Sequence, residues 1–78
     1  MLLNDHYQHF SQKILRLKEV IKKLGISRST IYDWLNTNSP RYDETFPKQV
    51  HLGLKSVGWL EYELDEWLLS RKKAQKHT

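Results

Sequence analysis

The first half of the chain contains two segments in which apolar residues recur with the period of an α-helix. The first segment carries them at Leu17, Val20, Ile21 and Leu24, which predicts a helix from about Lys18 to Leu24. Gly25 stands where a helix needs its left-handed cap, and Ser27 is a good N-cap for a second helix. That second helix places Ile31, Trp34 and Leu35 on one side. Two short helices joined through such a tight turn form a helix-turn-helix.

The pattern changes after a polar segment, 37–45, which is a loop by composition. Residues 48–52 alternate polar and apolar side chains, residues 53–56 can turn the chain, and residues 57–59 can return as a paired strand. A two-stranded ribbon of this length is stable only when it packs on something. Val50 and Trp59 are its apolar anchors, so we expect a small β-hairpin that lies against the helices.

A last helix is predicted from about Leu60 to Lys73, with Leu60, Leu64, Trp67 and Leu68 as its buried stripe. Its acidic residues lie in the first turns and its basic residues in the last, which is the order that the helix dipole favours. This polarity is a sufficient structural reason for Glu61, Glu63, Asp65 and Glu66, so they are not interpreted as a catalytic or metal-binding cluster.

The order of elements predicts a winged helix-turn-helix, mainly α with a small β-hairpin. The domain should span residues 14–74, between a flexible arm, 1–13, and a basic tail, 75–78. Three tryptophans, Trp34, Trp59 and Trp67, come from three different elements and should form a shared core.

Charge and composition narrow the functional classes. The net charge is +4 over 78 residues, and basic residues outnumber acidic ones between Lys13 and Lys55. Such an excess fits either a polyanion-binding surface or ordinary solvated charges. The chain has no cysteine, no apolar run long enough to span a bilayer and no signal-peptide pattern at its start. We therefore expect a cytoplasmic, nucleoid-associated bacterial protein without a membrane partner.

The second predicted helix has the side chains that a DNA-reading helix needs at its N-terminus. Hydroxyls and free backbone N–H groups can bind phosphate there, and Arg28 can reach phosphate or a guanine edge. Tyr32 can stack on sugar or contact phosphate, and Asn36 can reach a base edge if the helix lies deep. The predicted contacts are Ser27, Arg28, Ser29, Thr30, Tyr32 and Asn36. The alternative is a capped surface helix with a solvated arginine.

The hairpin supplies a second candidate surface. Its tip and exposed edge carry Lys48, His51, Lys55 and Ser56, beside Gly53, which permits close backbone approach. A wing of this kind lies along the phosphate backbone or the minor groove next to the recognition helix. The alternative is a solubilising edge on which lysines block strand pairing.

Metal binding and catalysis find little support in the sequence. His6 and His9 could share a helical face, but no further ligand has a fixed position near them. Serine, histidine and aspartate occur without a context that would activate a nucleophile. We expect no enzyme activity, no metal, no cofactor and no small-molecule ligand.

Several blocks of sequence, in this order, resemble the AlpA family of small prophage-associated transcriptional regulators, whose fold is related to excisionases and MerR-type winged helices. The blocks are residues 17–20, 24–32, 46–47, 52–53, 56–60 and 64–67, and the resemblance covers about residues 14–74. By position, residues 27–32 correspond to the family's recognition helix and residues 46–59 to its wing. Many members connect the two by a brief glycine-containing turn, whereas here Asn36–Thr45 is longer and offers Arg41 as an additional backbone contact.

The resemblance implies sequence-specific binding to double-stranded DNA, with activation of a mobile-element gene, typically an integrase gene. Two alternatives stay open: an excisionase that binds attachment-site DNA, and a protein-interaction module such as an anti-repressor. Because one such domain covers a short site, further copies of the chain or an integrase are expected as partners on DNA.

Overall fold

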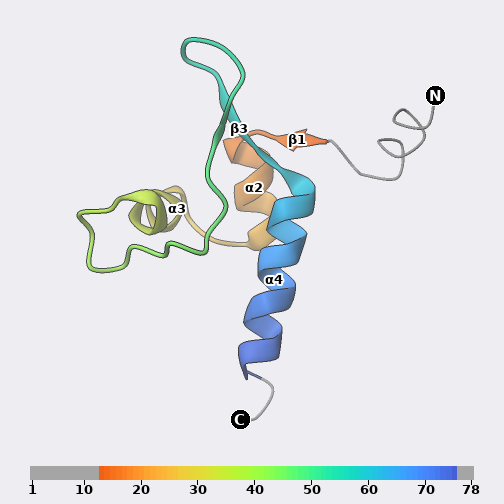
Figure 1. Cartoon of the computed structure of the whole chain (residues 1–78). Coiled ribbons are helices and arrows are strands. Elements are labelled where there is room, and N and C mark those ends of the chain that lie inside the picture. The colour runs from red at the N-terminus through yellow and green to blue at the C-terminus, as the bar shows by residue number, and fades with distance from the viewer. Residues whose placement is uncertain (1–12, 76–78) are drawn as a thin grey trace, which may run out of the picture.

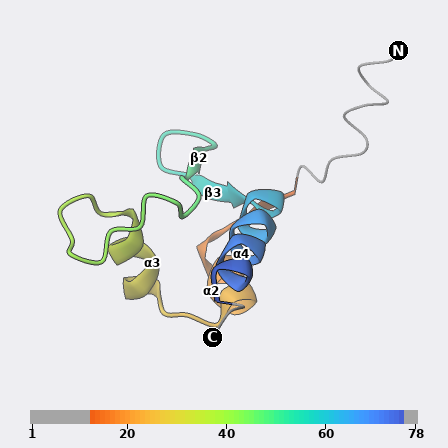
Figure 2. The ribbon, with the colours of Figure 1, turned by 60° about the horizontal axis from the view of Figure 1, so that its bottom comes forward.

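The computed structural model describes residues 13–75, which form three helices and three short strands. The elements follow in the order β1 (Ile14–Leu15), α2 (Leu17–Leu24), α3 (Arg28–Leu35), β2 (Val50–His51), β3 (Val57–Leu60) and α4 (Glu61–Gln75). In Figures 1 and 2, α2 and α4 lie side by side, and α3 lies to one side of them. The β2–β3 hairpin projects from the end of the domain at which α4 begins. The predicted winged helix-turn-helix is confirmed.

The two helices of the helix-turn-helix begin and end where local chemistry predicts. Gly25 has φ 69°, in the left-handed region, and its N–H donates to the carbonyl of Ile21. At the other end of α2, the Glu19 carboxylate accepts from the backbone N–H of Arg16 at 2.8 Å. The Ser27 hydroxyl caps α3 by accepting from the N–H of Thr30 at 3.2 Å. These caps satisfy backbone groups that a helix end leaves without an intrahelical partner.

The expected two-stranded ribbon is part of a three-stranded antiparallel sheet with the order β1-β3-β2. Ile14 pairs with Leu60 and Leu15 with Trp59 on one side of β3, and Val50 pairs with Gly58 on the other. The pairing of Ile14–Leu15, the segment before α2, was not expected from the sequence. This segment covers the second edge of β3, so the hairpin rests on a sheet rather than standing as an isolated ribbon.

The core draws one or two residues from almost every element. Its fully or almost fully buried side chains are Leu15, Val20, Ile31, Phe46, Trp59, Leu64 and Trp67. Trp34 packs against them while partly exposed, so the prediction of a shared tryptophan core is confirmed. The rings of Trp34, Phe46 and Trp67 form a cluster with centroid separations of 5.1–5.3 Å, within the range of favourable aromatic pairs.

Two details of the predicted core are wrong. Leu68 was expected in the buried stripe of α4, but it is 39% exposed and lines a surface depression with Leu24 and Ile26. Leu60 is half-buried and ends β3, with α4 beginning one residue later. The distal part of α4 extends past the body of the domain, so the apolar stripe has less to pack on there (Figure 1).

The predicted arm, 1–13, lies outside the described residues except for Lys13, whose carbonyl accepts from the N–H of Glu61 at 2.9 Å. Of the predicted tail, Gln75 ends α4, and the rest lies outside the described residues. Within residues 13–75, no helix is long and apolar enough to cross a membrane.

A substitution at Gly58 tests the close contact between β1 and β3. A Cβ at this position would collide with the Cγ2 atom of Ile14 and lie 3.0 Å from the carbonyl oxygen of Leu15. Gly58→Ala should therefore lower the free energy of unfolding by roughly 1–3 kcal/mol, as overpacking does, measured by urea denaturation. Gly53→Ala is the matched control, because a Cβ there meets nothing within 4 Å. Equal effects of the two substitutions would contradict the close β1–β3 contact.

Candidate nucleic-acid interface

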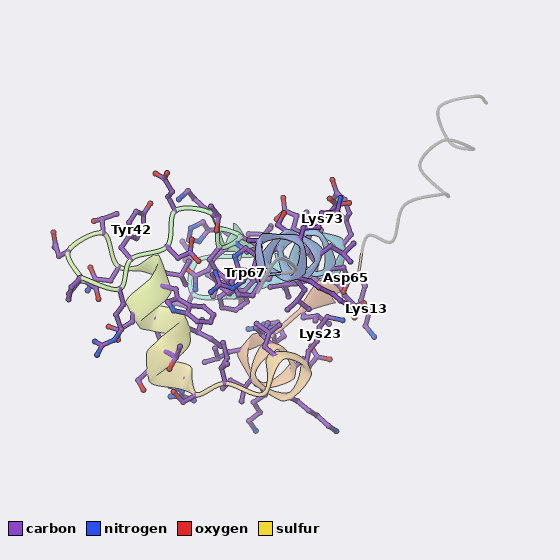
Figure 3. All side chains as sticks on the ribbon, turned by 90° about the horizontal axis from the view of Figure 1, so that it is seen from below. Lys13, Lys23, Tyr42, Asp65, Trp67 and Lys73 are labelled. Atoms are coloured by element: carbon purple, nitrogen blue, oxygen red, sulfur yellow. The ribbon has the colours of Figure 1, made fainter. Side chains whose placement is uncertain are left out.

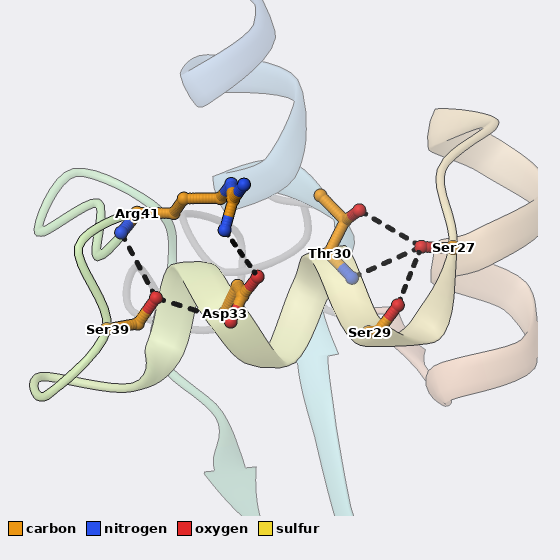
Figure 4. Close-up of polar contacts among 6 residues, drawn as sticks. All are labelled: Ser27, Ser29, Thr30, Asp33, Ser39 and Arg41. Atoms are coloured by element: carbon orange, nitrogen blue, oxygen red, sulfur yellow. Dashed lines mark hydrogen bonds and ion pairs between the residues drawn. The ribbon is translucent and has the colours of Figure 1, made fainter.

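The N-terminus of α3 presents a cluster of three hydroxyl groups to solvent (Figure 4). The Ser27 oxygen lies 3.2 Å from the Ser29 hydroxyl and 3.0 Å from that of Thr30. We call Ser27, Ser29 and Thr30 the hydroxyl cluster. Because Ser27 already accepts from the helix backbone, the cluster is both the cap of α3 and a set of polar groups at the positive end of the helix. Both predicted roles, capping and phosphate binding, are compatible with this geometry.

The other residues predicted to contact DNA, in α3 and at its end, differ in whether their side chains already have a partner within the chain. Arg28 is exposed, and within residues 13–75 its side chain makes no ion pair. Tyr32 is 44% exposed on the same helix. Asn36 follows the end of α3, where its side-chain oxygen accepts from the N–H of Asn38 at 2.9 Å. Its oxygen is therefore engaged in a turn, whereas Arg28 and Tyr32 face solvent.

The long connection that follows α3 folds back onto this helix. Asp33 accepts a hydrogen bond from the Ser39 hydroxyl at 3.2 Å and pairs with the guanidinium of Arg41 at 3.7 Å (Figure 4). The Ser39 hydroxyl also accepts from the N–H of Arg41. Arg41, predicted as an additional backbone contact, is thus held beside the carboxyl half of α3, with its side chain 72% exposed. Asp33 was missed as the anchor of this loop.

Asp43 fixes the end of the same connection. Its carboxylate accepts from the N–H and hydroxyl of Thr45 and pairs with Arg71 of α4 at 3.3 Å. Its own N–H donates to the carbonyl of Trp34, and the Thr45 hydroxyl accepts from the indole N–H of Trp67. Burial alone would raise the pKa of Asp43, but the Thr45 hydrogen bonds and the charge of Arg71 outweigh it and lower the pKa below its ordinary value of 3.8.

The hairpin bears its predicted basic residues on an exposed protrusion. We call residues 48–60 the wing. His51 and Lys55 are exposed, and Ser56 is partly buried, its carbonyl accepting from the N–H of Leu52 at 2.7 Å. Lys48 lies over the ring of Tyr42 with its ammonium 5.9 Å from the centroid, so the loop supports the base of the wing.

Ion pairing separates the basic residues into two groups. The ammonium of Lys23 in α2 lies 3.1 Å from the Glu61 carboxylate and 3.0 Å from that of Asp65, both in α4 (Figure 3). Its hydrogen bond to Asp65, and to a smaller extent the one to Glu61, raises the pKa of Lys23 above its ordinary value of 10.5. These two carboxylates therefore hold α2 and α4 together, a role beyond the predicted match to the helix dipole. Within residues 13–75, by contrast, Lys48 and Lys55 make no ion pair, like Arg28. The wing and the N-terminus of α3 thus carry uncompensated positive charge.

His6 and His9 lie outside the described residues, so the structure does not address their predicted lack of a metal-binding role. Among residues 13–75, no three acidic or histidine side chains are grouped so that they could hold a metal ion.

Comparison of the sequence with known proteins identifies its family. The model of the prophage CP4-57 regulatory protein family (AlpA) matches residues 13–72. The chain belongs to the AlpA family. It is 66% identical over 61 residues to the DNA-binding transcriptional activator AlpA of Escherichia coli (strain K12), covering 78% of this chain and 87% of that protein. It is 38% identical over 65 residues to the uncharacterized protein ORF88 of Enterobacteria phage P4, covering 83% of this chain and 67% of that protein. No solved structure matches it significantly.

The resemblance to the AlpA family inferred from the sequence is therefore confirmed, and the matched residues include α3, the long connection and the wing.

The anchoring of the connection by Asp43 can be tested through acid sensitivity. Because the folded pKa is lowered, the stabilisation is complete above pH 3.8 and is lost as the pH falls below that value. Asp43→Asn should cost about 1–3 kcal/mol of unfolding free energy at pH 7, since the Thr45 hydrogen bonds and the Arg71 contact are no longer made to a charged carboxylate. Its deficit relative to the unmodified chain should shrink as the pH falls below 3.8.

Urea denaturation followed by tryptophan fluorescence across this pH range measures both effects. Glu44→Gln is the matched control, because Glu44 is an exposed neighbouring carboxylate that makes no ion pair within residues 13–75. A deficit that is independent of pH would contradict the role of the Asp43 charge.

Proposed function

We propose that the protein is a sequence-specific DNA-binding transcriptional activator of a prophage or integrated mobile element, acting on an integrase or excision gene. The observation that carries the proposal is the exposed N-terminus of α3, where Arg28 makes no ion pair within residues 13–75 and three hydroxyl groups lie together. The chain that presents it is 66% identical to a protein named as a DNA-binding transcriptional activator. The relative from phage P4 and the prophage family description support the setting in a mobile element. Such a protein works in the bacterial cytoplasm, on the nucleoid.

In this proposal α3 enters the major groove with its N-terminus leading. Arg28 contacts a phosphate or the O6 and N7 atoms of guanine, and the hydroxyl cluster binds the adjacent phosphate. Tyr32 packs on the sugar-phosphate backbone. Asn36 reaches a base edge through its amide nitrogen, since its oxygen is occupied by Asn38.

The wing contacts the same duplex beside the recognition helix. It lies with α3 on the same side of α4 in Figures 1 and 2. In the proposal His51, Lys55 and Ser56 contact the phosphate backbone, and Lys48 at the base of the wing adds a further phosphate contact. Arg41 reaches phosphate by releasing Asp33, a pairing that costs little to break because it is long and exposed.

One domain of this size covers a short site, so several copies on repeated sites, or a partner such as an integrase, complete the assembly. Neither a membrane nor a small-molecule ligand has a role in this function.

Arg28→Ala should weaken binding to the specific duplex by roughly 1–3 kcal/mol without lowering thermal stability, because the side chain is exposed and unpaired. Lys55→Ala should weaken binding to all duplexes and reduce the slope of log K against log salt by about one unit. Fluorescence anisotropy with a labelled duplex at several salt concentrations measures both quantities.

The control is Lys73→Ala, which removes the same charge from the carboxyl end of α4 (Figure 3), far from the wing in Figure 1. Affinity that is unchanged by Arg28→Ala and Lys55→Ala would show that the surface is wrongly assigned. Binding to an acidic protein, without binding to any duplex, would instead favour an interaction module such as an anti-repressor.

DNase footprinting distinguishes the activator from a recombination directionality factor, because both use the same surface at different places. We expect protection at the promoter of an adjacent integrase gene. Protection confined to the attachment site would overturn activation in favour of an excisionase.

A further inference from the structure

The tip of the wing exposes a leucine that the fold does not use. Leu54 is fully exposed, at 103%, and Leu52 beside it is 48% exposed. Turn positions at a hairpin tip are ordinarily polar, since an apolar side chain there gains nothing from burial. Gly53 lies between the two leucines, and a Cβ on it would meet nothing within 4 Å, so the tip stands clear of the body. Leu54 therefore contributes little to the stability of this domain.

The surroundings of Leu54 are basic. No acidic residue occurs in the sequence between Glu44 and Glu61, and the exposed side chains of His51 and Lys55 flank the tip. A specific protein interface buries about 800 Å² per partner, far more than the tip of a two-stranded ribbon offers. A narrow, positively charged protrusion that ends in one leucine is instead matched to a groove of DNA, where phosphates line both walls.

We propose that Leu54 is an apolar wedge that enters the minor groove beside the recognition helix and partly unstacks one base step. Lys55 neutralises a phosphate at the edge of that groove, and the unstacked step opens a bend in the duplex. Pyrimidine–purine steps unstack most easily, so the wedge favours such a step at a fixed distance from the bases that Arg28 reads. The proposal rests on the proposed DNA-binding function and adds a residue that selects sequence through DNA deformability.

The test uses the full chain and a duplex of about 30 base pairs, the length of a typical bent site, selected from a random pool by the unmodified protein. The duplex contains one binding site, which removes any contribution from contacts between copies. 2-Aminopurine replaces adenine at each position in turn, because its fluorescence rises when its neighbours unstack. Fluorescent labels at the two ends report the bend through energy transfer.

The unmodified chain should raise 2-aminopurine fluorescence at one step and shorten the distance between the duplex ends. Leu54→Ala should abolish the fluorescence rise, reduce the bend and lower affinity roughly tenfold, since a buried leucine contact is lost. Leu54→Phe, which keeps a large apolar wedge, should retain all three properties. Leu69→Ala is the control, because Leu69 is 58% exposed on α4.

The outcomes separate this proposal from the one on which it rests. If Arg28→Ala loses affinity while Leu54→Ala changes neither affinity nor fluorescence, the wedge is wrong and DNA binding stands. A second duplex that carries two sites tests contacts between copies. If Leu54→Ala lowers affinity only on that duplex, the tip contacts another copy of the chain, which also overturns the wedge. If no duplex is selected, both proposals fail together.

Discussion

The contact among the rings of Trp34, Phe46 and Trp67 is the interaction on which the rest of the structure depends. Each ring comes from a different place in the sequence: Trp34 from α3, Phe46 from directly after the connection, and Trp67 from α4. A chain of this length has little apolar surface to bury, so three large rings replace what many aliphatic side chains supply in a larger domain. The cluster fixes α3 relative to α4, and α4 continues directly from the last strand of the wing. The orientation of α3 with respect to the wing therefore follows from this packing.

Polar contacts give the long connection a definite course around that cluster. Asp43 and Thr45 tie it to Arg71 and Trp67 of α4, and Asp33 ties its first half to α3. The long connection thus becomes part of the scaffold. The basic residues also differ in whether they make ion pairs. Lys23 and Arg71 hold elements together, while Arg28 and Lys55 make no ion pair within residues 13–75.

Signals that act over a few residues were sufficient to predict the helix pair, because Gly25 and Ser27 exert their effects on adjacent backbone. The pairing of β1 could not be predicted, since two residues carry no period and their partners in β3 lie far along the sequence. Helical periodicity identified the apolar face of α4 but not where the body of the domain ends, so Leu68 was placed in the core. The pairing of Arg41 with Asp33 could not be predicted either, because it depends on the course that the loop takes in the folded chain. Base contacts stay predictions because they are made with another molecule.

The position of β3 in the sheet has a consequence for how the chain acquires its structure. This central strand is the last to be synthesised, yet β1, near the start, pairs with it, and Lys13 accepts from Glu61. Contacts of such sequence separation form slowly, after the cost of closing a long loop. During translation α2 and α3 emerge before α4, and α3 gains its fixed orientation only after α4 has emerged. A nascent chain therefore carries the residues proposed to contact DNA before packing on α4 fixes their orientation.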